Sequence, residues 1–242
     1  MKLVLDVGNT TTKFGVFNND NLAETGRIET KLIVNELKSL LKNSAINTGI
    51  ISNVGHLDST TVTELLDLLP MHQLSAESNL PFKNNYSTPE TLGVDRIALV
   101  TAAIGMFPET NCLIIDAGTC ITYDFVDQQK VYHGGAISPG LRIRYESLHN
   151  FTAKLPLLVK SLPKNLTGDS TKESIHSGVV LGSVKEIDGV IDAYKERHSH
   201  LTVILTGGDS KFLSDQLKNS IFANSNFLLT GLNYLLDYNT LT

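Results

Sequence analysis

Residues 6–13, DVGNTTTK, place a carboxylate, a glycine and a run of small polar side chains directly after an apolar segment. Gly8 lets a ligand approach the backbone closely, and the Asn and Thr side chains offer hydrogen-bond donors beside exposed backbone N–H groups. Lys13 adds one positive charge. A carboxylate in a phosphate site repels the ligand unless a cation lies between them, so Asp6 implies Mg²⁺, bound directly or through water. The pattern predicts a cradle for polyphosphate oxygens, although an Asx-turn that closes a hairpin would use the same residue types.

A second acidic turn, DAGT at 116–119, follows another apolar run. An offset of 110 residues aligns the two turns and pairs identical residues: Leu3 with Leu113, Asp6 with Asp116, Gly8 with Gly118 and Thr12 with Thr122. Thr119 and the backbone of Gly118 can meet phosphates from the opposite side, and Asp116 can hold a cation. The repeat predicts a duplicated fold in which the two turns face one cleft.

The third candidate is Gly93–Arg96, GVDR, which begins a very apolar segment of helical character. The first turn of a helix favours an anion, because its free N–H groups and its dipole both attract negative charge. Asp95 can accept the proton of a substrate hydroxyl as that hydroxyl attacks phosphorus, and Arg96 can hold an anionic group. The alternative is that Asp95 only caps the helix.

Two glycine-rich segments, HGGAISPGL at 133–141 and LTGGD at 205–209, lie further along the chain. Tight packing alone explains either segment, but LTGGD ahead of a helix can also let adenine or ribose lie against the backbone. His198 and His200 have no Cys or acidic partners at ligand spacing. We therefore expect a solvated helix end there and not a zinc site.

Composition and charge exclude several classes of protein. The 242 residues are 41% hydrophobic and 19% charged, which supplies a buried core and argues against global disorder. A net charge of −5 without any basic run argues against nucleic-acid binding. No apolar stretch approaches the roughly 18 residues of a membrane span, and the first residues do not resemble a signal peptide. Two lone cysteines, Cys112 and Cys120, are more typical of reduced thiols than of a disulfide, so we expect a cytoplasmic protein.

Hydrophobic periodicity predicts strands that alternate with helices, and therefore a layered α/β architecture. Strands are expected at 4–7 and 14–17 as a hairpin, at 49–54, at 112–117 and 121–126 as a second hairpin, and at 201–206. Helices are expected at 33–42, 61–69, 93–107, 141–150, 174–197 and 210–218, with 70–92 mostly loop. The second acidic hairpin begins a new half, so we place a domain boundary near residue 110, between 1–110 and 111–242.

Taken in order, the motifs resemble those of the type III pantothenate kinases. They are Asp6-Val-Gly-Asn-Thr10, Gly93-Val-Asp-Arg96, Asp116-Ala-Gly-Thr119 and Gly134-Gly-Ala-Ile-Ser-Pro-Gly140, and LTGGD extends the match toward the C-terminus. The resemblance implies a fold of the actin, hexokinase and Hsp70 type, in which two related ribonuclease H-like α/β domains hold a nucleotide between them. That implication agrees with the internal repeat. Cys120 stands where the family commonly has alanine.

The resemblance also implies an activity and a set of site residues. The reaction is transfer of the γ-phosphate of ATP to pantothenate, the first step of coenzyme A biosynthesis, which gives 4′-phosphopantothenate and ADP with Mg²⁺ and a monovalent cation (K⁺ or NH₄⁺). By the family's pattern Asp95 is the base and Asp116 holds the monovalent cation. ATP is bound by Asp6, Val7, Gly8, Asn9, Thr10, Thr11, Thr12, Lys13 and Thr119. Pantothenate is bound by Tyr86, Gly93, Val94, Asp95, Arg96 and Thr171. Family members are dimers with sites near the subunit contact, so a homodimer is implied, with no nucleic-acid or membrane partner.

Two other hypotheses remain open at this stage. The chain could be a catalytically inactive relative, because the family includes proteins first described as transcriptional accessory factors; the intact Asp6, Asp95 and Asp116 argue against this. It could also be a kinase of the same fold that phosphorylates a sugar or another small alcohol, because fold alone does not fix the substrate.

Overall fold

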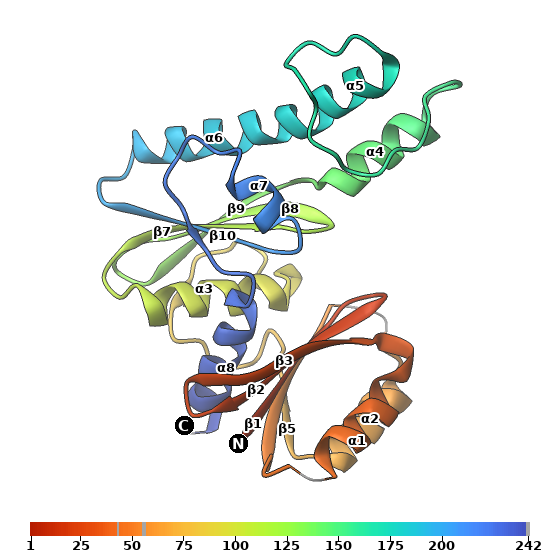
Figure 1. Ribbon diagram of the computed structural model, residues 1–242. Coiled ribbons are helices and arrows are strands. Elements are labelled where there is room, and N and C mark those ends of the chain that lie inside the picture. The colour runs from red at the N-terminus through yellow and green to blue at the C-terminus, as the bar shows by residue number, and fades with distance from the viewer. Residues whose placement is uncertain (43, 55–56, 241–242) are drawn as a thin grey trace. The chain divides into compact units, whose positions relative to one another are not determined.

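The computed structural model describes residues 1–42, 44–54 and 57–240. The chain forms two compact units. The N-terminal unit contains Met1–Pro108, Lys130–Tyr132 and Asn226–Thr242, and the C-terminal unit contains Glu109–Gln129 and His133–Ser225. Each unit is built from a sheet and helices, as the sequence predicts for an α/β protein (Figure 1).

The N-terminal unit is built on a five-stranded sheet of order β3-β2-β1-β4-β5. The strands are β1 (Lys2–Val7), β2 (Thr11–Asn18), β3 (Asn21–Glu29), β4 (Thr48–Asn53) and β5 (Met71–Gln73). Strand β1 pairs antiparallel with β2 and parallel with β4, which confirms the predicted hairpin. Alternate residues of β1, such as Leu3 and Leu5, pack on α1 (Ile33–Leu41) and α2 (Ser59–Leu68), because successive strand side chains point to opposite faces.

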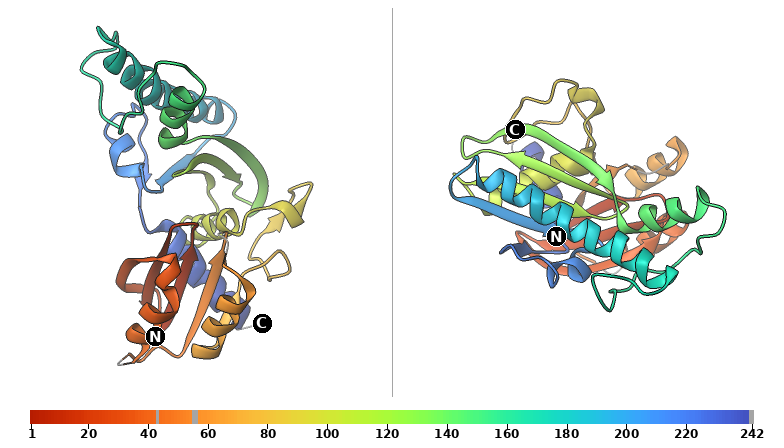
Figure 2. Two further views of the ribbon diagram at one scale, coloured as in Figure 1. Left: turned by 90° about the vertical axis from the view of Figure 1, so that its right-hand side faces the viewer. Right: turned by 90° about the horizontal axis from the view of Figure 1, so that it is seen from above.

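Helices α3 (Val94–Met106) and α8 (Phe227–Thr240) complete this unit. Helix α8 contacts α3, β1 and β4, and it lies on the side of the sheet away from α1 and α2 (Figures 1 and 2). The closest approach is at Gly231, where an added Cβ would lie 1.8 Å from the carbonyl oxygen of Ala98. Nine consecutive residues of α3, from Arg96 to Ile104, are buried. The apolar character of 93–107 therefore reflects a helix that is covered on all sides.

The C-terminal unit contains the strands β11-β10-β7-β8-β9 of a six-stranded sheet, apart from the first two residues of β9. The sixth strand, β6 (Lys83–Asn84), pairs with those two residues, which belong with it to the N-terminal unit. The other strands are β7 (Asn111–Ala117), β8 (Cys120–Val126), β9 (Val131–Pro139), β10 (Leu201–Thr206) and β11 (Phe222–Ala223). The helices are α4 (Leu141–Asn150), α5 (Thr171–His176), α6 (Gly182–Lys195) and α7 (Ser210–Ser214). Leu113, Ile115 and Leu205 of the sheet form one core with Ile187 and Ile191 of α6. None of the described helices is both long and apolar enough to cross a membrane.

Several elements differ from the sequence prediction. The single helix expected at 174–197 is α5 and α6 joined by a π-helical turn at Ser177–Leu181, and the expected helix at 210–218 is only the short α7. The segment 70–92, expected to be mostly loop, contains β5, the two-residue strand β6 (Lys83–Asn84) and a 3₁₀ turn at Pro89–Thr91. Strand β3 and helix α8 were not anticipated, and α8 returns the chain to the N-terminal unit.

The close contact between α8 and α3 gives a stability prediction. Gly231→Ala should lower the free energy of unfolding by about 2–3 kcal/mol, because backbone atoms of Ala98 must move to admit a methyl group. Urea denaturation followed by circular dichroism measures this change.

Gly189→Ala is the matched control, because Gly189 lies within α6 and an added Cβ there meets nothing within 4 Å. It should raise the free energy of unfolding by roughly 0.5–1 kcal/mol, since alanine favours the helical backbone more than glycine does. Equal effects of the two substitutions would contradict the packing described for α8.

Candidate active site

The first acidic turn is fixed from beneath by a threonine. The Thr30 hydroxyl donates to the carbonyl oxygen of Gly8 at 2.9 Å, and its oxygen lies 3.1 Å from the hydroxyl oxygen of Thr12. The Gly8 N–H donates to the carbonyl of Thr11 at 3.2 Å, and a Cβ at Gly8 would collide with that oxygen. Thr12 is fully buried. Its hydroxyl therefore serves the turn, and the exposed polar residues that a ligand can reach are Asn9, Thr10 and Thr11.

Asp6, Lys13 and Asp95 come together beside this turn. Asp6 pairs across the hairpin with Lys13. Burial of the Asp6 carboxyl and the nearby negative charge of Asp95 raise the pKa of Asp6 to about 6, although Lys13 acts in the opposite direction. This electrostatic coupling places Asp95 near Asp6, although the two residues are far apart in sequence. Two carboxylates at one corner favour a cation or a transferable proton between them.

Helix α3 begins at this corner and holds Asp95. The N-cap is Gly93, and the Asp95 carboxylate accepts a hydrogen bond from the N–H of Arg96 at 2.9 Å. A Cβ at Gly93 would lie 2.4 Å from Asp95 Oδ1, so a glycine is needed to keep this carboxylate in place. Asp95 thus lies in the first turn of a buried helix, where the helix dipole attracts negative charge.

Arg96 is surrounded by two tyrosine rings. Its Cζ atom lies 5.4 Å from the ring centre of Tyr86 and 6.0 Å from that of Tyr132, and the two rings stack with centres 6.2 Å apart. The N–H of Asn85 donates to the carbonyl of Tyr132 at 3.0 Å, and β6 pairs parallel with Val131 and Tyr132 at the start of β9. This Tyr–Arg cluster (Tyr86, Arg96 and Tyr132) presents a guanidinium suited to an anionic group.

Tyr132 is a residue that sequence reasoning missed. It lies in the sequence VYHGG, just ahead of two glycines, and its place as the second residue of β9 is the sequence signal that could have indicated a buried ring. The side chain is 0% exposed and also meets the ring of Phe82 edge-on at 6.1 Å.

The second acidic turn is surrounded by the two glycine-rich segments. Gly207 of LTGGD has a φ of 93°, and a Cβ there would lie 2.3 Å from Asp116 Oδ1. The Asp209 N–H donates to the carbonyl of Ala117 at 2.9 Å. From the other segment, the Gly140 N–H donates to the carbonyl of Thr119 at 3.1 Å. Both segments therefore pack against the 116–119 turn, and Thr119 remains exposed.

The two turns differ by one residue in length. Asp6 lies opposite Lys13, whereas Asp116 lies opposite Thr122. The offset of 110 residues therefore holds for the first strand of each hairpin but not for the second, and the pairing of Thr12 with Thr122 expected from the sequence is wrong. The lysine of the first turn is replaced by a neutral residue in the second.

Comparisons with known proteins agree with these motifs. A sequence profile of the type III pantothenate kinases matches residues 2–193. The type III pantothenate kinase of Flavobacterium psychrophilum is 48% identical over 98% of this chain and 99% of its own. That of Christiangramia forsetii is 51% identical over 99% of each chain. The chain belongs to the type III pantothenate kinase family.

Solved structures show the same fold at low sequence identity. A protein from Campylobacter jejuni described as a Baf family transcriptional activator has a TM-score of 0.67 at 19% identity and covers 99% of this chain and 100% of its own. A 2-dehydro-3-deoxygalactonokinase from Sinorhizobium meliloti has a TM-score of 0.60 at 12% identity, with 97% and 98% covered. At these identities the likeness shows the fold alone, which is the actin-like sugar kinase fold expected from the sequence.

Two further expected residues of this pantothenate kinase family member lie in the C-terminal unit. Thr171 is exposed at the start of α5, next to Ser170, whose side chain caps the helix. Cys120 is half-buried at the start of β8, and Cys112 is buried, where desolvation raises the pKa of its thiol to about 12. The two thiols form no disulfide. His198 follows the end of α6, and its ring centre lies 4.3 Å from the ring centre of Phe125 in β8.

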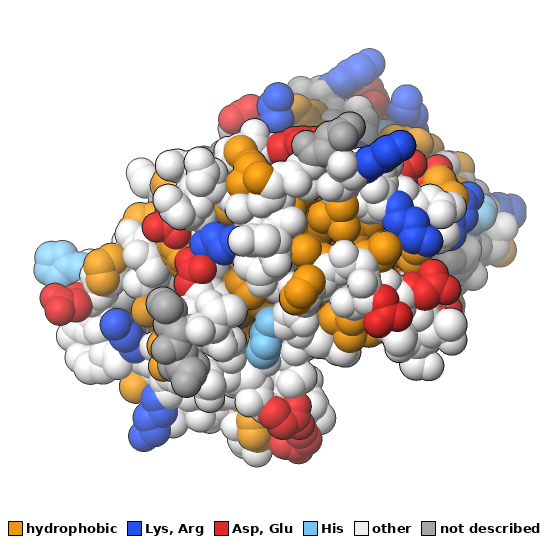
Figure 3. Space-filling view, turned by 90° about the horizontal axis from the view of Figure 1, so that it is seen from below, with side chains coloured by type: hydrophobic (Ala, Val, Ile, Leu, Met, Phe, Trp, Pro, Cys, Tyr) orange, Lys and Arg blue, Asp and Glu red, His pale blue; other side chains and the backbone are white. Residues whose placement is uncertain are grey.

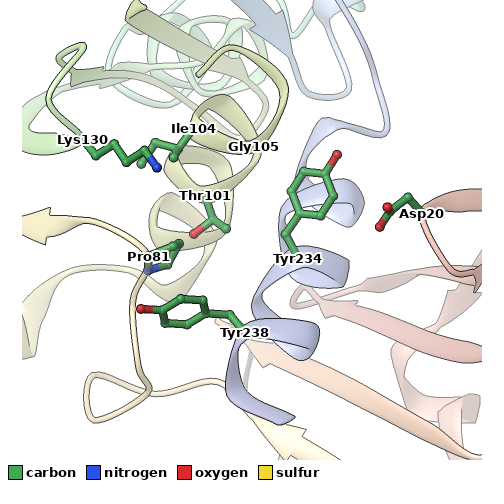
Figure 4. A pocket seen from close by; sticks show the side chains of 8 residues that line it. All are labelled: Asp20, Pro81, Thr101, Ile104, Gly105, Lys130, Tyr234 and Tyr238. Carbon is green, nitrogen blue, oxygen red and sulfur yellow. The ribbon is translucent and has the colours of Figure 1, made fainter. Parts of the chain in front are cut away.

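A pocket of about 420 Å³ lies apart from these residues in the N-terminal unit. It opens between α3 and α8 and is lined by side chains such as Thr101, Lys130 and Tyr234 (Figure 4). Neither Asp6 nor Asp95 lines this pocket, so we do not assign the reaction to it.

The raised pKa of Asp6 predicts a pH-dependent stability in the protein free of ligand and metal. An aspartate whose folded-state pKa lies above its unfolded value stabilises the fold below the unfolded pKa and loses that stabilisation as pH rises through about 6. Asp6→Asn should therefore raise the free energy of unfolding at pH 8 by about 1–3 kcal/mol, and this gain should vanish toward pH 4. Chemical denaturation across this range, in EDTA, measures it.

Asp58→Ala is the control of opposite sign. The Asp58 carboxylate accepts a hydrogen bond from the N–H of Thr61 at 2.8 Å at the start of α2, which lowers its pKa. Its loss should destabilise the protein at pH 8, and the difference should disappear as acid protonates the wild-type carboxylate. If Asp6→Asn also destabilises the protein at pH 8, the electrostatic account of the first corner is wrong.

Proposed function

We propose that this protein transfers the γ-phosphate of ATP to pantothenate, giving 4′-phosphopantothenate and ADP in the first step of coenzyme A biosynthesis. Membership of the type III pantothenate kinase family supports the reaction. The observation that carries the chemistry is the electrostatic coupling of the carboxylates Asp6 and Asp95 beside the first acidic turn, with Arg96 of the Tyr–Arg cluster on the same helix as Asp95.

In this proposal Asp95 is the base. Its carboxylate accepts the proton of the pantothenate hydroxyl as that oxygen attacks the γ-phosphorus, and the bond from phosphorus to the β-bridging oxygen breaks to release ADP. Gly93 and Val94 keep the first turn of α3 open to the substrate, and Arg96 with Tyr86 binds its carboxylate. Thr171 adds a further substrate contact.

ATP is bound in this proposal by residues 6–13 and Thr119. Asn9, Thr10 and Thr11 offer exposed donors to the phosphates, and Lys13 supplies a positive charge. Val7 and Thr12 are buried and shape the turn.

Two kinds of cation fit these turns. The charge of Asp6 beside Asp95 suits Mg²⁺, which neutralises phosphate charge when bound. Asp116 is assigned to a monovalent cation, K⁺ or NH₄⁺, because the second acidic turn of the family's pattern holds one and a carboxylate is an oxygen ligand suited to it. Among the described residues, no three or more His, Cys, Asp or Glu side chains lie close enough together to hold a metal ion by themselves. Remaining ligands would come from backbone carbonyls, nucleotide and water.

The other two hypotheses have less support. A transcriptional role without catalysis is suggested by the description of the Campylobacter jejuni protein, but its 19% identity carries only the fold. The net charge of −5 and the mixture of acidic and basic side chains on the face in Figure 3 do not favour DNA. A sugar or other small alcohol as substrate is favoured only by neighbours that share the fold, such as the Sinorhizobium meliloti kinase.

We further propose a cytoplasmic homodimer with no nucleic-acid or membrane partner. Exposed apolar side chains of the C-terminal unit support self-association. They are Ile137, Phe151, Leu157, Val159, Leu162 and Leu166, and Phe151 and Val159 are 88% and 87% exposed. Because large apolar side chains that gather on a surface mark interaction sites, we propose that these residues form the subunit contact. Thr171, a proposed substrate residue, follows them in sequence.

A substrate-panel assay tests the reaction and the base together. Purified protein with ATP, Mg²⁺ and K⁺ should release ADP when pantothenate is added and not when sugars or other small alcohols are added. Asp95→Asn should lower kcat by at least about 100-fold with little change in ATP binding, because the proton acceptor is lost. Asp67→Asn, an exposed carboxylate on α2, should leave kcat unchanged.

No pantothenate-dependent ADP release by the wild type in K⁺ and Mg²⁺ would refute the proposed reaction. Full activity of Asp95→Asn would instead remove only Asp95 as the base. Omitting K⁺ and NH₄⁺ should lower the activity, as a monovalent cation at Asp116 requires.

The dimer proposal is tested by light scattering after gel filtration. The wild type should have the mass of two chains. The double variant Phe151→Ser with Val159→Ser should shift toward the monomer, because it removes one exposed aromatic ring and one exposed branched side chain from the proposed contact. Leu32→Ser, at a 41% exposed leucine of the N-terminal unit, is the control and should stay dimeric. A monomeric wild type would refute the proposal.

A further inference from the structure

Four polar side chains form a connected network within the C-terminal unit. They are Tyr123 of β8, Ser138 of β9, Arg144 of α4 and Glu186 of α6. The Tyr123 hydroxyl donates to Glu186 Oε1 at 2.8 Å, and Arg144 Nη2 donates to Glu186 Oε2 at 2.6 Å. The same Nη2 atom donates to Ser138 Oγ at 2.9 Å. The Glu186 carboxylate thus accepts hydrogen bonds from side chains of β8 and α4.

The network also forms a hydrogen bond to the Pro139–Gly140 backbone, which contacts the second acidic turn. Arg144 Nε donates to the carbonyl of Pro139 at 2.8 Å. The next residue, Gly140, donates its N–H to the carbonyl of Thr119, and a Cβ there would lie 2.2 Å from the carbonyl oxygen of Gly118. Three hydrogen bonds therefore connect Glu186 to the 116–119 turn. The first joins Glu186 to Arg144, the second joins Arg144 to the Pro139 carbonyl, and the third joins the Gly140 N–H to the Thr119 carbonyl.

The geometry points to Arg144 and Glu186 as positioning residues that set the backbone of the 116–119 turn for ATP and the monovalent cation. The inference rests on the proposed binding of both at that turn. Neither side chain touches the reacting groups. They act by holding the Ser138–Gly140 segment in place. In that position the Gly140 N–H donates to the Thr119 carbonyl and the Gly140 backbone packs closely against the Gly118 carbonyl.

The chemistry of the network suits this task. Arg144 uses separate nitrogens of one rigid guanidinium, so its contacts to Pro139 and Glu186 fix their relative position. Burial acts to raise the pKa of Glu186, but hydrogen bonds from Arg144, Ser138 and Tyr123 outweigh it and lower that pKa. Arg144 and Glu186 are 21% and 30% exposed, so solvent screens the pair only in part. Tyr123 is 2% exposed and would lose the acceptor of its hydroxyl if Glu186 were replaced by an apolar residue.

A simpler reading is that the network only holds α4 and α6 onto the sheet. The two readings differ in what the kinetics show. A purely stabilising pair would lower the melting temperature and leave the kinetic constants of the folded enzyme unchanged. A positioning pair changes the kinetics of ATP and of the cation selectively, because the hydrogen bonds described for this network lie within the C-terminal unit that carries the 116–119 turn.

The test uses Arg144→Lys and Glu186→Gln in the full-length enzyme. Each should raise the KM for ATP and the half-activating K⁺ concentration by about five- to 30-fold, since one charge-assisted contact is lost. The KM for pantothenate should stay within about twofold. The double variant should cost less than the product of the single effects, because the two residues act through the same contact.

Arg142→Lys and Glu146→Gln are matched controls. These residues form the other Arg–Glu pair of α4 at 2.7 Å and are 63% and 38% exposed. In the part of the chain that the structure describes, neither side chain bonds to residues 138–140. They should leave all three constants unchanged.

The outcomes separate the inference from the proposed function. An inactive wild type refutes the function. An active wild type whose Arg144 and Glu186 variants lose only thermal stability, or change the constants for ATP and pantothenate equally, refutes the inference alone. The same selective change in the Arg142 and Glu146 controls would also refute it.

Discussion

The burial of the Asp6 carboxyl beside the negative charge of Asp95 is the constraint on which the site depends. Burial first and the charge of Asp95 second raise the pKa of Asp6 to about 6, so the ionised carboxylate is unfavourable there and the rest of the fold must hold it in place. Asp6 is fixed by strand pairing with β2 and β4. Asp95 is fixed by a helix buried from Arg96 to Ile104. Stability is thereby exchanged for a corner that attracts cations and protons, as functional sites often require.

The two acidic turns are alike in sequence but differ in register and surroundings. A single residue of difference in turn length places a lysine opposite Asp6 and a threonine opposite Asp116. Thr30 supports the first turn from within its own unit, whereas glycine-rich segments pack against the second. Strand register and neighbouring segments therefore distinguish two turns that share the same short motif.

The sequence was sufficient for features that depend on local pattern. The hairpins, the helix at GVDR and the family followed from alternation, apolar periodicity and ordered motifs. Features that depend on long-range packing could not be read in this way. The ring of Tyr132 against Arg96, the hydroxyl of Thr12 turned inward to Thr30, and the position of α8 on α3 all join residues distant in sequence. The roles given to individual site residues remain predictions.

The place of α8 has a consequence for how the chain folds during synthesis. Domains usually fold in order as they leave the ribosome, with the N-terminal one first. Here the N-terminal unit needs residues 227–240, which are made after the whole C-terminal unit. Until then the apolar surface of α3 that meets Gly231 stays open to solvent and to chaperones. The order of translation thus makes the packing of α8 on α3 a late step in folding of the N-terminal unit.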